Sequence, residues 1–139
     1  MDVLPGKYMN FLSNALEGFS PELYLATLVE VAHSDGLHPT EEVFLKERAE
    51  SFGLDLNNLP AVPDDLSQLP SSTRIFLYRD ALMLAYADGQ LSEKEEEHLS
   101  QLAQKMSLSE KITSDIKDWI NDFSNLLDRM ENIIKAVTD

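Results

Sequence analysis

Two stretches of similar sequence, residues 31–42 and residues 84–96, decide which fold this chain can adopt. The first is VAHSDGLHPTEE and the second is LAYADGQLSEKEE. In each, an apolar segment ends at an Asp-Gly pair and an acidic segment follows. Asp-Gly is typical of a tight turn, because glycine adopts positive φ without steric cost. Each stretch therefore predicts the end of one helix, a turn and the start of the next helix.

The similarity continues into both flanking segments, which indicates an internal repeat. Asp35 is aligned with Asp88, and one extra residue, Gln90, is allowed in the second copy. The aligned apolar pairs then include Ala32 with Ala85, Leu45 with Leu99 and Ala49 with Ala103. Because helical phase is preserved on both sides of the turn, we predict a duplicated helical hairpin with a pseudo-twofold axis.

Apolar residues recur with helical spacing along most of the chain, and no segment shows sustained period-2 alternation. We therefore expect one all-α domain over residues 1–139, a compact bundle of about six to seven helices. Its parts are a first helix at about 7–17, repeat one at about 20–54, a connector at 55–71, repeat two at about 72–108, and one or two C-terminal helices at 109–138. We expect Ser71 or Ser72 to cap the second repeat, and one short helical turn at 64–68.

The C-terminal segment has its apolar residues about 3.5 positions apart on average, as in a coiled-coil seam. It forms either one unusually long helix or two helices with a break near 121–124. Its apolar stripe either packs on the domain's own core or joins two copies in a homodimer.

The charge balance limits the classes of partner. Eleven Lys and Arg against 25 Asp and Glu give a formal net charge of −14. Such a field repels nucleic acid and anionic lipid, and favours cations, basic protein segments or solubility alone. There is no cysteine, no apolar run long enough to span a membrane, and no basic segment leading into an apolar stretch near residue 1. We expect a cytoplasmic protein without membrane insertion.

Catalytic patterns are missing from the sequence. It contains no Ser-His-Asp set, no phosphate-binding glycine loop and no His-Glu-x-x-His pattern. We therefore expect no enzyme.

The two aspartates of the turns are the residues that local structure explains least. Asp35 and Asp88 lie at the C-terminal ends of predicted helices, where the helix dipole disfavours a carboxylate by roughly 0.3–1 kcal/mol. Each either accepts hydrogen bonds from amides of the next helix or binds a cation. Asp-Gly with Glu seven residues after the Asp matches the second half of an EF-hand loop, but the first half is absent.

The glutamates that follow have a structural explanation of their own. Ser92 and Glu95 form a predicted capping box, and His38 and Glu41 occupy the same positions in the first copy. Two interpretations stay open: turn and cap residues only, or a shared site for a divalent cation such as Ca²⁺ or Mg²⁺. The candidate cation ligands are Asp35, Glu41, Glu42, Asp88 and Glu95.

The paired stretches VAHSDGLHPTEE and LAYADGQLSEKEE resemble the tellurite-resistance TerB-like family over about residues 22–108. The resemblance implies an all-helical domain with repeated halves, as in the N-terminal domain of a membrane-anchored DnaJ-like co-chaperone. It also implies a divalent-cation site at Asp35 and Asp88, with Glu41 or Glu42 and with Glu95. The implied role is non-enzymatic, in stress or metal resistance through a protein partner. The alternative is a purely structural interaction or oligomerisation domain without metal.

Overall fold

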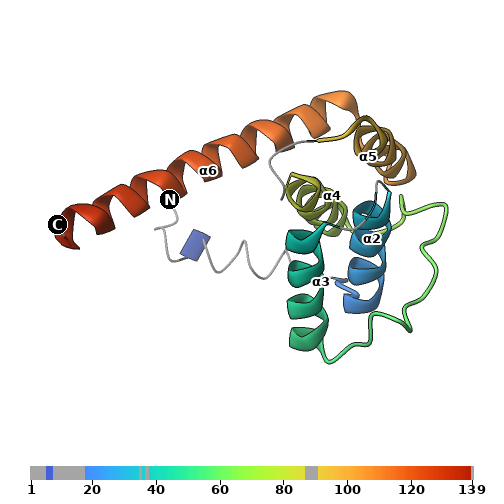
Figure 1. Ribbon diagram of the computed structural model, residues 1–139. Helices are drawn as coiled ribbons and strands as arrows, with labels where there is room; N and C mark the ends of the chain where they lie inside the picture. Colours follow the sequence, from blue (N-terminus) through green and yellow to red (C-terminus); the bar gives the residue numbers. More distant parts are fainter. Residues whose placement is uncertain (1–5, 8–17, 35, 37, 87–90, 139) are drawn as a thin grey trace. The chain divides into compact units, whose positions relative to one another are not determined.

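The computed structural model of the chain describes residues 6–7, 18–34, 36, 38–86 and 91–138. This part of the chain contains five helices and no strands. The helices are α2 (Pro21–His33), α3 (Pro39–Phe52), α4 (Ser71–Ala85), α5 (Glu93–Lys105) and α6 (Glu110–Thr138) (Figure 1). The predicted all-α class is confirmed for the described residues.

Helices α2 and α3 begin and end at residues that satisfy their terminal backbone groups. The Ser20 hydroxyl accepts a hydrogen bond from the Leu23 N–H at 3.3 Å and caps α2. In the turn that follows, Gly36 has a φ of 81°, as the Asp-Gly pattern predicts. Helix α3 starts with Pro39 at its first position and ends at Gly53, whose φ of 67° is left-handed.

The start of α4 differs from the prediction. The helix begins at Ser71, and the residue in the N-cap position is Pro70, which has no side-chain hydrogen bond to the helix. The expected cap at Ser71 or Ser72 is therefore wrong, because both serines already lie inside the helix. Helix α5 begins as predicted, with the Ser92 hydroxyl accepting from the Glu95 N–H at 3.1 Å.

The chain forms two compact units, Met1–Ser107 and Leu108–Asp139. In the first, α2 packs mainly against α4, α3 packs on α2, and α5 packs on α4. Helix α2 also contacts α5, and α3 contacts α4. If the hairpin α2–α3 is exchanged with the hairpin α4–α5, the same pairs of helices are in contact. A duplicated hairpin would produce such a pattern, and the repeat with its pseudo-twofold axis stays a prediction.

The core of the first unit draws apolar side chains from all four helices. Its most deeply buried members include Leu25, Leu28, Val31, Leu45, Ala81, Leu82, Leu99 and Met106. Each fully buried leucine contributes about 1.5–3 kcal/mol relative to exposure. The aligned apolar pairs Ala32 with Ala85, Leu45 with Leu99 and Ala49 with Ala103 are all buried.

The connector between α3 and α4 contains no helix, so the short turn expected at 64–68 is wrong. Leu66 in this segment is nevertheless only 2% exposed. Its backbone N–H donates to the Lys105 carbonyl at 2.9 Å. The connector therefore caps the end of α5. The Leu69 N–H also donates to the Leu66 carbonyl at 3.3 Å, which forms a single turn at 66–69 without a helix.

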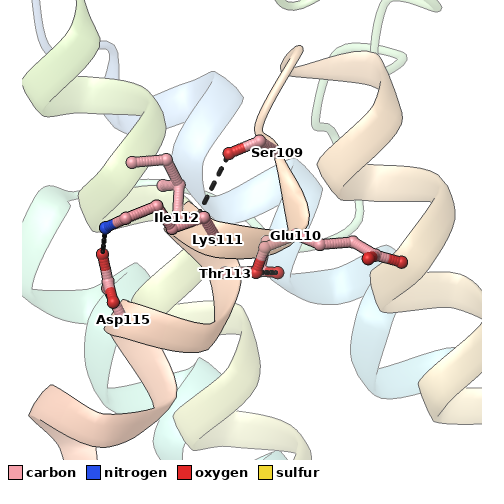
Figure 2. A network of polar contacts seen from close by, with 6 residues as sticks. All are labelled: Ser109, Glu110, Lys111, Ile112, Thr113 and Asp115. Carbon is pink, nitrogen blue, oxygen red and sulfur yellow. Dashed lines mark hydrogen bonds and ion pairs between the residues drawn. The ribbon is translucent and has the colours of Figure 1, made fainter.

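The second unit contains α6, which is one uninterrupted helix of 29 residues. The alternative of a break near 121–124 is therefore wrong. Figure 2 shows the start of α6, where the Ser109 hydroxyl accepts from the Ile112 N–H at 3.2 Å. In the same first turn, Lys111 Nζ lies 2.8 Å from Oδ2 of Asp115, which is one turn further along the helix, and both side chains are exposed.

The predicted number of six to seven helices is not confirmed, since the described residues contain five. The first predicted helix, at about 7–17, lies outside the described residues apart from Lys7. Whether α6 completes the domain formed by residues 20–108 stays a prediction.

Arg74 forms hydrogen bonds with three segments of the first unit. Its Nη1 donates to the Met106 carbonyl at 2.8 Å, and its Nε donates to the Leu69 carbonyl at 3.0 Å. Its Nη2 also donates to the Ser71 hydroxyl at 3.2 Å. One guanidinium thus satisfies carbonyls of the connector and of the end of α5 from the first turn of α4.

We predict that Arg74→Met lowers the free energy of unfolding by about 2 kcal/mol, because it leaves these carbonyls without their charged donor. Urea denaturation at neutral pH measures the change. Arg129→Met, on the exposed surface of α6, is the matched control and should change stability by less than about 0.5 kcal/mol. Equal losses of stability in the two variants would contradict a stabilising role for the Arg74 hydrogen bonds.

Candidate functional site

The five predicted cation ligands fall into two groups. Asp35 and Asp88 lie outside the described residues. The other three, Glu41, Glu42 and Glu95, are described, and their surroundings differ. Glu41 is 1% exposed and Glu95 is 2% exposed, whereas the Glu42 side chain is 46% exposed. Two of the three described carboxylates are therefore buried.

The two buried glutamates occupy the same position, the third residue of α3 and of α5. Glu95 Oε1 accepts from the Ser92 N–H at 3.2 Å and completes the capping box. Glu41 Oε1 accepts from the His38 N–H at 3.3 Å. The predicted capping role of both glutamates is confirmed.

Glu42 behaves as a surface residue. Its Oε1 lies 2.8 Å from Lys46 Nζ, one turn further along α3. The hydrogen bond from Lys46, together with its positive charge, lowers the pKa of Glu42. By burial and by position in the helix, the counterpart of Glu95 is therefore Glu41 and not Glu42.

Glutamate side chains are rarely as deeply buried as those of Glu41 and Glu95. Taking an ionised carboxylate out of water costs several kcal/mol unless charges or hydrogen bonds compensate. A helix N-terminus compensates by about 0.3–1 kcal/mol, and the cap hydrogen bonds are long.

Within the described ranges, no group of three or more His, Asp or Glu side chains is close enough together to hold a metal ion. Asp35 and Asp88 are outside those ranges, so the predicted ligand set is not tested. None of the described helices is both long enough and apolar enough to cross a membrane.

Sequence reasoning missed a polar pair that links the two central helices. The Tyr24 hydroxyl of α2 donates to Asp80 Oδ2 of α4 at 2.7 Å, and Arg79 Nε donates to Asp80 Oδ1 at 2.9 Å. Burial and then the neighbouring Asp80 carboxylate raise the pKa of Tyr24, so the hydroxyl keeps its proton. The only signal in the sequence is one acid within an otherwise largely apolar part of α4.

The comparisons with known proteins bear on the fold. No protein-family model matches the chain, and no curated protein matches it. Among solved structures, a tellurite resistance protein from Nostoc punctiforme superposes with a TM-score of 0.61. The chain has the fold of that protein. The two are 20% identical, and the match covers 82% of this chain and 79% of the Nostoc chain. The resemblance to the TerB-like family is thereby confirmed at the level of the fold.

The cap geometry predicts the effect of one substitution. Ser92→Ala removes the acceptor for the Glu95 N–H and should lower the free energy of unfolding by about 1 kcal/mol. Urea denaturation measures it. Ser100→Ala, within the same helix and exposed, should leave stability unchanged or slightly raised, because alanine is the better helix former. A Ser92→Ala variant as stable as the Ser100→Ala variant would refute the cap.

Proposed function

We propose that this chain is a non-enzymatic, TerB-like module that binds a divalent cation through its two acidic turns. The observation that carries the proposal is the burial of Glu41 and Glu95 at equivalent helix starts. Each follows an Asp-Gly turn in the sequence. Capping alone needs only a carboxylate near the helix end, and an exposed one suffices for that.

The chemistry of the ligands favours a hard cation. The candidate site consists of Asp35, Asp88, Glu41 and Glu95, with backbone carbonyls of the turns as further oxygen donors. Carboxylate and carbonyl oxygens are the ligands of Ca²⁺ and Mg²⁺ in proteins. A net charge of −14 raises the local cation concentration around the molecule.

The proposed cellular role is in stress or metal resistance, through contacts with a protein partner. It rests on the fold shared with a tellurite resistance protein and on the acidic surface, which is complementary to basic protein segments. We propose a cytoplasmic location for this role.

Thermal unfolding with and without Ca²⁺, Mg²⁺ and Mn²⁺ tests the site. At a cation concentration of 100 times Kd, the folded chain should gain about 2.7 kcal/mol. The double variant Asp35→Asn with Asp88→Asn should lose that gain. Glu95→Gln should also reduce the stabilisation by the cation, because glutamine carries no charge. Glutamine still offers an acceptor to the Ser92 N–H, so the helix cap is kept.

Glu96→Gln is the matched control, since it removes the same charge from an exposed neighbour on α5. It should retain the full cation effect. No shift of the melting temperature with any of the three ions would overturn the proposal, as would an equal loss in the Glu95→Gln and Glu96→Gln variants.

A second candidate function is oligomerisation through α6, with the acidic surface serving solubility. The pattern that favours it is a stripe with strictly alternating spacings of four and three residues. The stripe consists of Ile112, Ile116, Trp119, Phe123, Leu126, Met130, Ile133 and Val137. The Trp119 and Phe123 rings are stacked, with centroids 5.2 Å apart. Ile116 is buried, whereas the stripe from Trp119 to Val137 is exposed. A second copy would cover this exposed part in a homodimer.

Sedimentation equilibrium tests this second candidate. A dimer should give about twice the chain mass of 15.7 kDa. Leu126→Lys should return it to the monomer mass, because it places a charge within the seam. Asn125→Lys adds the same charge beside the stripe and should leave the dimer intact. A wild-type chain that stays monomeric at high concentration would exclude dimerisation.

A further inference from the structure

The first unit contains a cavity of about 320 Å³, and none of Glu41, Glu42 and Glu95 is among the described residues that line it. It is lined by α2 and the residues before it, by the C-terminal half of α3, and by α4 with the end of the connector. Its walls are mainly apolar, as in most binding sites for small organic molecules, which start at roughly 300 Å³.

One wall of the cavity is aromatic. The rings of Phe19, Tyr24 and Phe52 lie against one another, with centroid separations of 5.4, 5.9 and 6.1 Å. At the rim, Gly18 has a φ of 67°, and a Cβ there would meet Pro70 Cγ at 2.7 Å. The close approach of these two backbone segments therefore depends on glycine. The rings are inclined to one another by 59–84°, so this wall offers both ring faces and ring edges to an aromatic ligand.

Most polar side chains that line the cavity already form hydrogen bonds or ion pairs within the protein. Asp80 accepts from Tyr24 and pairs with Arg79, so its negative charge is compensated. Arg79 also stacks over the Phe76 ring, 4.6 Å from the centroid. These contacts hold the three polar groups in place and leave little net charge on them.

Arg48 is different from the other charged residues of the cavity. Its guanidinium stacks over the Phe44 ring at 4.9 Å, and it forms no ion pair with any described residue. Among the described residues that line the cavity, Arg48 and Arg79 against Asp80 give a net charge of about +1, in a chain of net charge −14. Guanidinium groups bind carboxylates in bidentate geometry, with strong charge-assisted hydrogen bonds.

We propose that this cavity binds a small organic monoanion, an aromatic carboxylate, whose carboxylate pairs with Arg48 and whose ring lies on the wall formed by Phe19, Tyr24 and Phe52. A cationic ligand would be repelled by Arg48. The one acid among the described lining residues, Asp80, is already paired with Arg79 and is not free to bind a cation. A neutral molecule would use the wall but leave Arg48 without a counter-ion. A polyanion would meet the repulsion of the whole acidic molecule.

Isothermal titration calorimetry on the full chain tests the proposal with three probes of one skeleton. They are 1-naphthylacetate, the corresponding alcohol 2-(1-naphthyl)ethanol, and the corresponding amine 2-(1-naphthyl)ethylamine. The carboxylate should bind with a Kd below about 1 mM, a modest affinity for its size. The alcohol and the amine should each bind at least about tenfold more weakly, because they lose the charge-assisted hydrogen bonds.

Two variants of equal charge locate the anion. Arg48→Gln should weaken 1-naphthylacetate binding at least about tenfold. Arg129→Gln, on α6, should not change it. Arg48 and Arg129 are both exposed, so both variants should fold, as circular dichroism can verify. Leu23→Trp, which fills the cavity from α2, should abolish binding of all three probes.

Several outcomes would overturn the proposal. One is an alcohol or amine that binds as tightly as the carboxylate, and another is equal binding by the Arg48→Gln and Arg129→Gln variants. The absence of binding by all three probes at millimolar concentration would also refute it.

Discussion

The packing of α2 against α4 is the contact on which the rest of the first unit depends. Each of these helices has seven buried residues, whereas α3 has three and α5 has four. The two central helices thus bury most of the apolar surface, and α3 and α5 each add a narrow stripe to one side of the pair. Small residues contribute to this arrangement, since Ala32, Ala81 and Ala85 are almost fully buried and allow helices to approach closely. A helix with a narrow stripe is stable only on such a support.

The outer helices each bury a glutamate, and this is where local and tertiary requirements meet. At the third position of a helix, a glutamate side chain is favoured by the cap amide and by the helix dipole. The tertiary packing then covers Glu41 and Glu95 to 1% and 2% exposure, which a carboxylate in water would resist. A residue that is favoured for a local reason is therefore also part of the packed interior. The proposed cation site builds on this burial.

Much of the fold could be predicted from the sequence, and the parts that could not share one cause. Ser92 was predictable as a cap because its partner is three residues away. The absence of helix around Leu66 was not predictable, because the Leu66 N–H donates to the carbonyl of Lys105, which is 39 positions further along the chain. In the candidate site, the turns and the capping glutamates follow from spacing. The sequence alignment already pairs Glu41 with Glu95, but the burial of these two residues and the exposure of Glu42 come only from the structure.

The sequence by itself determined the helical class, the position of the turn around Gly36, and the helix starts at Pro39 and Glu93. These depend on hydrogen bonds and dihedral preferences within a few residues of the chain, so the local pattern contains them. The tertiary structure alone decided which glutamates are buried, that Tyr24 and Asp80 meet, and that an aromatic cavity with one unpaired guanidinium forms between α2, α3 and α4. Those features join residues many positions apart, and their free energy arises from desolvation, which exists only when the helices have packed.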